Sequence, residues 1–375
     1  MTSIFEEILK LRNGTPLVID DKNSNRYRIV TVEPNGSKTA YYFSTPIYNH
    51  RTRKALDLKF HTKDETIYAV GSNANITVTE NIRMENAEGA CIVSLVGKNN
   101  FISEREIAHD NVRLYPTTNG IAMKSPCQGE KPLTFTVEVT KPFLQVRAND
   151  KYFALMSEKF KPFFTISCIG TVDIMGNTIA PTRLNYQKIT DRKYTIEISP
   201  CSLMGASLLL EIGLYEPKLF LDTTVESKHP KINNVFGNIA YIGTTKEYGE
   251  QWLYSRPDFS KMSELNDKKI LRAILHLPRF NSAPVKLRAS KVAARFCSFG
   301  STWNNKIAET AVPIDSSTSN GYTHMDLISI LSDQHGRLFK GEGFIIKAAY
   351  RDAGFSVIST GDNYLSPQIL EINYK

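Results

Sequence analysis

Short runs of β-branched and aromatic residues recur along nearly the whole chain after Gly14, and this feature constrains the fold most. Examples are "RYRIVTVEP", "TAYYFSTPIYN", "ACIVSLVG", "LTFTVEV", "KYTIEIS" and "SLLLEIGLY", with turn-forming stretches such as "PNGS", "NAEG" and "TTNG" between them. This rhythm is typical of sandwiches of short antiparallel strands, whereas alternating strands and helices would show longer helical periods. We therefore predict an all-β protein built from β-sandwich domains.

A short helix is predicted at the N-terminus, in "MTSIFEEILKLRNG". Ser3 and Glu6 have the spacing of a capping box, and Gly14 is placed to end the helix. Its apolar face consists of Ile4, Ile8 and Leu11. A helix this short needs a surface to pack on, and its own sheet is favoured over a partner protein. The stretch has no basic segment followed by an apolar core, so no secretory signal is predicted, and no apolar run in the chain approaches a membrane span.

The length of 375 residues is too great for one small core and predicts two or three domains. Proline and glycine interrupt the strand pattern in "KSPCQGEKP" and again in "LYEPKLF". These interruptions divide the chain into a predicted N-terminal β-rich domain (1–125), a middle β-sandwich-like domain (126–216) and a C-terminal domain (217–375).

The C-terminal segment carries an ordered series of short motifs, "LFLDTTVES", "NNVFGNIAYIGT", "WLYSRPDFS", "FCSFGSTW", "GEGFIIKAAY" and "SPQILEINY". In this order they resemble the DNRLRE family, a jelly-roll β-sandwich module of bacterial surface proteins that is related to carbohydrate-binding modules. The matching positions are Asp222, Asn234, Gly237, Phe259, Ser260, Thr302, Trp303, Asp326, Gly343, Phe344, Pro367, Leu370, Ile372 and Tyr374. The resemblance implies a jelly roll over residues 217–375 and a role in binding carbohydrate. The chain departs from the family in "RPDFS", which reverses the usual Phe-Asp order.

A tryptophan in the loop "FCSFGSTWNNK" allows two interpretations. An exposed Trp303 beside amides would suit a sugar ring, because an aromatic face contacts sugar C–H groups while amides orient hydroxyls. A buried Trp303 would instead seal the end of a sandwich, and the resemblance favours this plug because the family's tryptophan recurs as a fold signature. The predicted carbohydrate-binding residues are Tyr248, Trp303, Asn304, Asn305 and Tyr364.

The sequence gives little support for catalysis or for a cofactor. It contains no G-x-S-x-G elbow, no Walker loop, no H-E-x-x-H motif and no dinucleotide fingerprint, so we predict that the chain is not an enzyme. Sandwiches related to the resembled family often hold a structural calcium ion, and the carboxylates that would supply oxygen ligands are Asp222, Asp258, Asp326 and Asp362. These residues form no spaced calcium loop, so no bound metal is predicted.

The net charge of +8 is spread over the chain. Residues 217–375 hold 20 Lys and Arg against 15 Asp and Glu, a surplus of five, and residues 1–216 hold the remaining three. Such a diffuse surplus lacks the basic stripe of a nucleic-acid-binding protein, so nucleic acid is not an expected partner. The five cysteines form no C-x-x-C pair, and Cys91, Cys168 and Cys201 lie in or beside apolar runs, so we predict reduced and buried thiols there.

Two functional classes remain. The first is a noncatalytic surface protein that binds carbohydrate or cell wall, with a polysaccharide or wall glycan as its partner. The second is a structural component of a phage particle or surface assembly, such as a tail, fibre or decoration protein, with copies of itself or other particle proteins as partners. The all-β pattern and the missing signal fit the second class, and the cellular location stays open.

Overall fold

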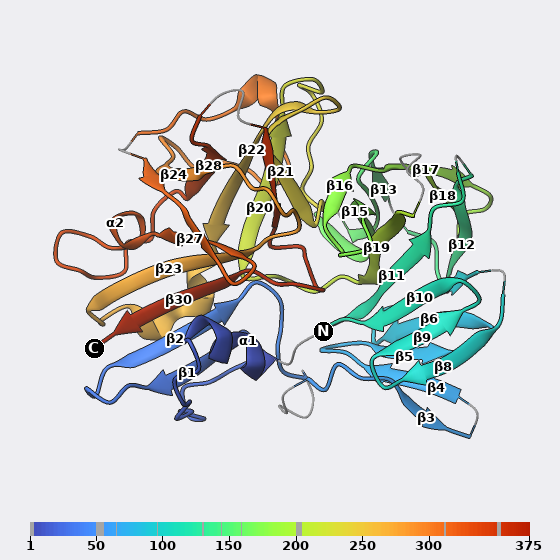
Figure 1. Cartoon of the computed structure of the whole chain (residues 1–375), viewed down its shortest axis with the longest axis horizontal. Helices are drawn as coiled ribbons and strands as arrows, with labels where there is room; N and C mark the ends of the chain where they lie inside the picture. Colours follow the sequence, from blue (N-terminus) through green and yellow to red (C-terminus); the bar gives the residue numbers. More distant parts are fainter. Residues whose placement is uncertain are drawn as a thin grey trace. The chain divides into compact units, whose positions relative to one another are not determined.

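The computed structural model describes residues 4–49, 56–64, 66–95, 97–129, 131–143, 145–158, 160–199, 205–310, 313–350 and 354–375 (Figure 1). Most of these residues form strands in four antiparallel sheets, and the helix α1 (Ile4–Leu11) lies at the N-terminus. The predicted all-β sandwich fold with a short N-terminal helix is therefore confirmed. Within the described residues, no helix has the length and apolar character needed to cross a bilayer.

The chain is organised into two compact units. We call Tyr48–Glu216 together with Phe236–Asn238 the central unit, and Thr2–Ile47, Pro217–Val235 and Ile239–Lys375 the terminal unit. This grouping differs from the three predicted domains. Residues before Tyr48 belong with the C-terminal segment because Lys38–Phe43 pairs with the last strand, Ile369–Tyr374. Residues on both sides of position 125 lie in the central unit.

The central unit consists of two sheets that enclose one hydrophobic core. The first sheet contains β3 (His61–Lys63), β4 (Thr66–Val70), β5 (Asn75–Val78), β6 (Asn81–Asn86), β7 (Gly89–Ser94), β12 (Leu133–Val139), β17 (Arg183–Lys188) and β18 (Lys193–Ser199). The second contains β8 (Asn99–Ser103), β9 (Glu106–His109), β10 (Val112–Pro116), β11 (Gly120–Pro126), β13 (Gln145–Ala148), β14 (Tyr152–Glu158), β15 (Lys161–Val172), β16 (Thr178–Ala180) and β19 (Ser207–Leu214). Alternate side chains such as Val137 and Ile212 fill the space between the sheets, as in other β-sandwiches.

Two of the three cysteines predicted to be buried lie in this core. Cys91 and Cys168 are buried free thiols, and burial raises the pKa of Cys168 to about 12. Burial also raises the pKa of Cys91 well above its usual value. The prediction is confirmed for these two residues, and Cys201 lies outside the described residues.

The terminal unit is a second two-sheet sandwich. Its six-stranded sheet contains β1 (Arg28–Val32), β2 (Lys38–Phe43), β23 (Ile270–Pro278), β26 (Ser317–Ser319), β27 (Tyr322–Asp326) and β30 (Ile369–Tyr374). Its seven-stranded sheet contains β20 (Phe220–Glu226), β21 (Ile239–Thr245), β22 (Gly249–Pro257), β24 (Leu287–Lys291), β25 (Ile314–Asp315), β28 (Phe344–Ala348) and β29 (Phe355–Ser359). The chain passes repeatedly from one sheet to the other between β22 and β30, and Leu253, Leu275 and Ile372 meet in the core between them.

Helix α1 packs on the outer face of the six-stranded sheet of the terminal unit. Ile8 on its apolar face is fully buried, and the hydroxyl of Tyr322 on β27 donates to Glu7. Just beyond the helix, Arg12 donates to Glu33 at the end of β1. The helix therefore packs on its own sheet, as its apolar face predicts. The remaining helical turns are α2 (Ile328–Leu331), η1 (Phe259–Leu265) and η2 (Trp303–Asn305).

Candidate functional site

The segment that carries Trp303 covers the outer face of the seven-stranded sheet. In β22, Leu253 points into the sandwich core, whereas Tyr254 faces outward. Val292 and Phe296 close over Tyr254 in a small hydrophobic cluster. The other members of this cluster are Val225, Ile345, Trp252, Trp303 and Ile307. The loop is therefore part of a folded cover on the sheet.

Trp303 is partly buried against Trp252, with 4.7 Å between the ring centroids. The ammonium group of Lys306 lies 4.6 Å from the Trp303 ring centroid, a cation–π contact. The carboxamide of Asn305 accepts the backbone N–H of Thr302 at 2.6 Å and donates to the carbonyl of Gly300 at 3.0 Å. These contacts hold the loop together from within, which favours the plug interpretation of Trp303.

The other predicted sugar-binding residues are placed differently. Asn304 is exposed, and its N–H donates to the carbonyl of Pro230 at 3.1 Å, next to His229, whose ring contacts Tyr248. Tyr248 and Tyr364 are only 2% and 6% exposed. Their rings therefore present little surface to a ligand, and the ring of Tyr248 is covered in part by His229 and Tyr241.

The turn that carries Tyr364 is fastened to the sheet at a different point from the tryptophan loop. This turn is fastened to β20 at Asp222, through the N–H of Gly361, whereas Trp252 beside Trp303 pairs with Val225 on the same strand. Three residues along a strand span about 10 Å. The structure thus links Tyr248 to the loop of Trp303, Asn304 and Asn305 through Pro230 and His229, and it fastens the turn of Tyr364 to another point of β20.

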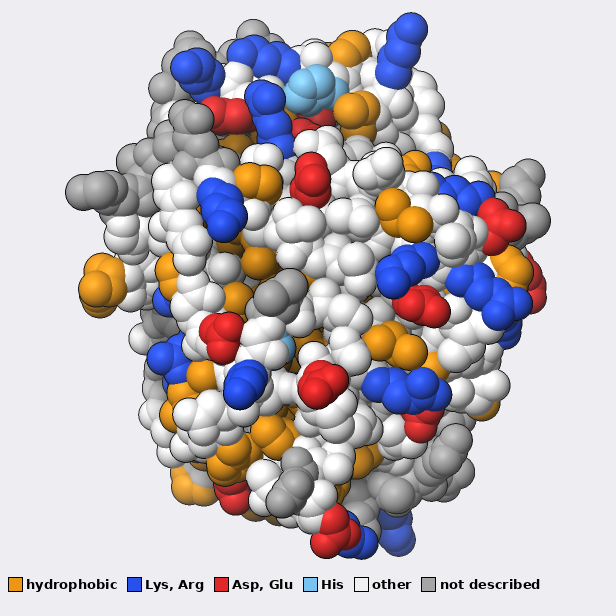
Figure 2. Space-filling model, turned by 90° about the vertical axis from the view of Figure 1, so that its right-hand side faces the viewer, with side chains coloured by type: hydrophobic (Ala, Val, Ile, Leu, Met, Phe, Trp, Pro, Cys, Tyr) orange, Lys and Arg blue, Asp and Glu red, His pale blue; other side chains and the backbone are white. Residues whose placement is uncertain are grey.

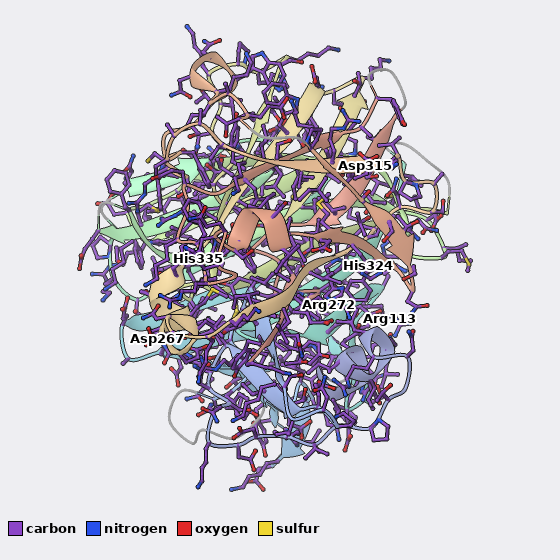
Figure 3. All side chains as sticks on the ribbon, turned by 90° about the vertical axis from the view of Figure 1, so that its left-hand side faces the viewer. Arg113, Asp267, Arg272, Asp315, His324 and His335 are labelled. Carbon is purple, nitrogen blue, oxygen red and sulfur yellow. The ribbon has the colours of Figure 1, made fainter. Side chains whose placement is uncertain are left out.

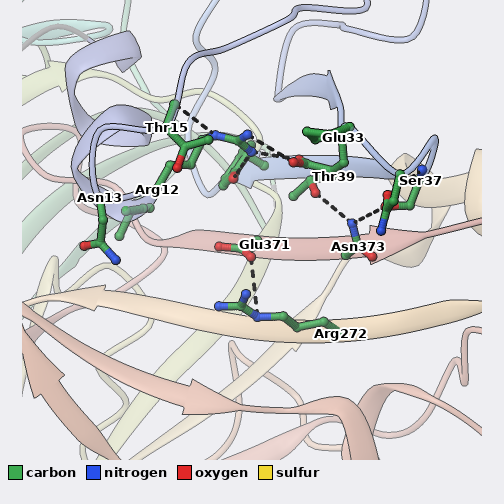
Figure 4. Close-up of a pocket in the computed structure, with 13 residues that line it drawn as sticks. Arg12, Asn13, Thr15, Glu33, Ser37, Thr39, Arg272, Glu371 and Asn373 are labelled. Carbon is green, nitrogen blue, oxygen red and sulfur yellow. Dashed lines mark hydrogen bonds and ion pairs between the residues drawn. The ribbon is translucent and has the colours of Figure 1, made fainter.

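A second site, which the sequence did not indicate, lies beside α1 on the outer face of the six-stranded sheet (Figure 4). It is a pocket of about 560 Å³ with mostly hydrogen-bonding side chains. Its lining consists of Leu11, Arg12, Asn13, Thr15, Glu33, Pro34, Asn35, Ser37, Thr39, Tyr41, Arg272, Glu371 and Asn373. We call it the polar pocket.

Strand register explains why these polar side chains share one face. Asn373 on β30 lies between Thr39 on β2 and Arg272 on β23, and Glu371 is the partner of Tyr41. The residues between them, such as Leu370 and Ile372, point into the sandwich core. Successive side chains of a strand alternate between its two faces. The residues that alternate with the buried ones therefore share the outer face, and in these strands they are polar.

One wall of the polar pocket is a charged clamp. The guanidinium of Arg12 donates to both carboxylate oxygens of Glu33, at 2.7 and 3.0 Å, and to the hydroxyl of Tyr41 at 3.2 Å. The hydrogen bond from Arg12 lowers the pKa of Glu33 to about 2, and burial raises the pKa of Tyr41 to about 12. The clamp is therefore fixed and charged at neutral pH, as expected for a two-pronged Arg–carboxylate pair.

The opposite wall contains Glu371 and the groups that face it. One carboxylate oxygen lies 3.6 Å from Nε of Arg272, and the other lies 3.1 Å from Nε2 of His276. Nδ1 of His276 lies 2.8 Å from Nδ1 of His324, and Figure 3 labels Arg272 and His324 on their neighbouring strands. Burial lowers the pKa of His324, which favours its neutral form. Arg272 and His276 thus fix the carboxylate of Glu371 in the pocket wall.

The four carboxylates considered as calcium ligands have other partners. Asp222 accepts from Ser255, Asp258 caps η1 through Ser260, Asp326 accepts the N–H of Ile328, and Asp362 contacts Lys218. Across the described parts of the chain, no three His, Cys, Asp or Glu side chains are grouped so as to hold a metal ion.

On the face in Figure 2, the described basic and acidic side chains are interspersed.

No family model and no curated protein matches this sequence. The resemblance of residues 217–375 to DNRLRE modules stays a prediction.

The plug interpretation of Trp303 leads to a test of stability. Trp303→Ala is expected to lower the free energy of unfolding by about 2 kcal/mol, less than the roughly 3–5 kcal/mol of a fully buried tryptophan, because the ring is only partly buried. Asn304→Ala in the same loop is the control and should change stability little. Urea unfolding followed by circular dichroism measures both. An unchanged unfolding curve for Trp303→Ala would favour the sugar platform.

Proposed function

We propose that this protein is a noncatalytic carbohydrate- or cell-wall-binding protein and that its glycan binds in the polar pocket. The observation that carries the proposal is the combination of volume and lining: about 560 Å³, surrounded by carboxylate, guanidinium, amide and hydroxyl groups. Ligand pockets commonly have volumes of about 300–1,000 Å³. A lining this rich in donors and acceptors suits a ligand with many hydroxyl groups.

The charges of the polar pocket favour an uncharged sugar. Arg12 and Arg272 are balanced by Glu33 and Glu371, so the ionic side chains of the lining sum to zero. The carboxylates offer acceptors for sugar hydroxyls, and the half-exposed Arg272 offers donors. Asn373 is already oriented, since its amide donates to Ser37 at 3.1 Å and to Thr39 at 2.9 Å. An ordered lining reduces the entropy lost on binding.

The proposal is tested by the retention of the full-length protein on a panel of wall and plant polysaccharides. The wild type is expected to bind at least one neutral polysaccharide, and Arg272→Ala is expected to weaken that binding about tenfold, or roughly 1.4 kcal/mol. Arg83→Ala is the matched control, because Arg83 is a similarly exposed arginine that pairs with Glu85 in the central unit. Equal loss in both variants would argue against the polar pocket.

The alternative is a structural component of a phage particle or surface assembly. It is favoured by the turn between β15 and β16, where Ile174 and Met175 are 87% and 81% exposed. Large exposed apolar patches mark contacts between proteins, and these two adjacent side chains would contribute to such a patch. A folded wild-type chain that binds no polysaccharide but forms defined oligomers in mass photometry would replace the carbohydrate proposal with this one.

A further inference from the structure

Three ionisable side chains are buried together in the terminal unit, away from the polar pocket. They are Lys218, just before β20, Asp362, between β29 and β30, and Asp222, within β20. Their residues are 6%, 6% and 1% exposed. Nζ of Lys218 directly contacts Oδ2 of Asp362, although the two residues are 144 positions apart in the sequence. An amine and a carboxyl group are therefore held against each other out of water.

Asp222 is the third member of this buried group. Its two carboxylate oxygens accept hydrogen bonds of 2.6 Å from the hydroxyl of Ser255 and from the N–H of Gly361. Gly361 precedes Asp362, so this bond ties Asp222 on β20 to the turn that carries Asp362. Burial raises the pKa of Asp362 to about 6, and the charge of Asp222 contributes to this increase. Burial also raises the pKa of Asp222 itself.

We propose that Lys218 and Asp362 become joined by an intramolecular amide bond, with Asp222 as the group that transfers the protons. In the reaction, the ammonium of Lys218 gives a proton to the buried carboxylates, and its free amine attacks Cγ of Asp362. A C–N bond forms, the C–O bond to the protonated hydroxyl breaks, and one water molecule leaves. The balance is one amine and one carboxylic acid in, one amide and one water out, with no oxidant or cofactor.

Burial changes the equilibrium of this condensation. In water, a separated ammonium and carboxylate are well hydrated, and hydrolysis of the amide competes. In the buried site both ions have lost their hydration, which penalises the charged pair, whereas an amide is neutral. The direct contact between Nζ and the carboxyl group also supplies the proximity that an intermolecular reaction lacks.

Asp222 is suited to move protons because it is buried, oriented and close enough for its charge to act on both Lys218 and Asp362. The hydrogen bonds from Ser255 and Gly361 fix its carboxyl group. Its raised pKa makes it able to accept a proton from the amine and to return it to the leaving hydroxyl. Asp222 therefore has the role of general acid and base in the condensation, and Ser255 has the role of positioning it.

The link would connect the segment before β20 with the turn before β30. Both strands belong to the sandwich of the terminal unit, and β20 and β30 are the first and last strands of its C-terminal segment. A covalent tie between the ends of this segment would limit how far the unfolded chain can extend. This would suit a protein that works outside the cell or on a particle.

Intact mass spectrometry of the denatured full-length protein tests the proposal. The wild type is expected to be lighter than its sequence mass by one water molecule, and a digest should contain one branched peptide with both Lys218 and Asp362. Lys218→Arg keeps the positive charge but cannot form this amide, and it should have the full sequence mass. Lys286→Arg, at an exposed Lys–Asp pair with Asp315, is the control and should keep the lighter mass.

The variant Asp222→Asn tests the proton-transfer role, because it removes the carboxyl group of Asp222 and keeps both residues of the link. Most of this variant is expected to have the full sequence mass, with the folded state checked by circular dichroism. If it does not fold, the wild-type mass and the branched peptide still decide the proposal. A folded wild type at full sequence mass overturns it and leaves an ordinary buried ion pair. Loss of water without the branched peptide also overturns it, because cyclisation at another aspartate gives the same mass.

Discussion

Lys218→Met is expected to lower the free energy of unfolding by about 3–5 kcal/mol, because the variant buries the carboxyl groups of Asp362 and Asp222 with no amino group for Asp362 to pair or bond with. This expectation holds whether the native contact to Asp362 is an ion pair or an amide. Both tryptophans of the chain, Trp252 and Trp303, belong to the terminal unit, so urea unfolding followed by tryptophan fluorescence reports on the unit that contains Lys218.

Lys286→Met provides the matched comparison for this change. Lys286 also contacts an aspartate, Asp315, at 2.6 Å, but both side chains are nearly half exposed, and water screens such surface pairs so that they contribute little to stability. The expected loss is therefore several times smaller. Equal losses in the two variants would mean that burial does not determine the contribution of Lys218.

The loss caused by Lys218→Met should also depend on pH. Where Asp362 is a free carboxyl group, burial raises its pKa from 3.8 to about 6 even beside the lysine, so its charged form is disfavoured in the folded protein. A raised carboxyl pKa means that stability decreases as the pH rises from about 4 to about 6. Without Lys218 this decrease should be larger and extend higher, so the variant should be closest to wild type in acid.

Gly120→Ala is expected to lower the free energy of unfolding by about 3 kcal/mol, at the upper end for overpacking. Gly120 on β11 faces Gly213 on β19, and a Cβ atom there would lie 2.1 Å from the carbonyl oxygen of Ile212 and 2.5 Å from Cα of Gly213. These are backbone atoms of a paired strand, so no side chain can rotate away. The two central strands would have to separate.

Gly300→Ala controls for the general effect of replacing a glycine. Its Cβ would meet nothing closer than 3.5 Å, an ordinary contact, so its stability should remain near that of the wild type. Calorimetric melting compares the two variants and the wild type. If the Gly120→Ala variant has the same melting temperature as the Gly300→Ala variant, this result would contradict the close packing of β11 against β19.

The local patterns of the sequence were sufficient to predict the strand-rich fold and the N-terminal helix. Period-two runs such as "LTFTVEV" become β12 with Phe135, Val137 and Val139 buried, because one face of each strand must be apolar. The spacing of Ile4, Ile8 and Leu11 likewise predicted a helix with one packing face. These are local properties, readable in a window of a few residues.

The polar pocket was not predictable in this way because its lining comes from opposite ends of the chain. Arg12 and Glu33 precede β2, whereas Glu371 and Asn373 lie on β30, and only the pairing of β2 with β30 brings them together. No local pattern encodes that pairing. The contact of Lys218 with Asp362 has the same origin, since its residues appear separately in "EPKLF" and "GDNYL".

The predicted sugar-binding residues show that a position in a turn does not predict the exposure of a side chain. Turn residues such as Tyr248 and Tyr364 were expected to be exposed because turns lie at the surface. In the structure these tyrosines fold back under their turns, where the ring of Tyr248 contacts His229 and Tyr241. Burial of a large aromatic ring is favourable by itself, and turn position does not prevent it.

Hydrogen–deuterium exchange of the wild-type protein with a retained polysaccharide is the most direct test of the proposed function. Binding in the polar pocket predicts slower exchange on binding in residues 12–15, 33–41 and 371–373, with residues 296–306 unchanged. Slower exchange confined to residues 296–306 would move the site to the Trp303 loop. A folded wild type that no polysaccharide protects anywhere would contradict carbohydrate binding itself.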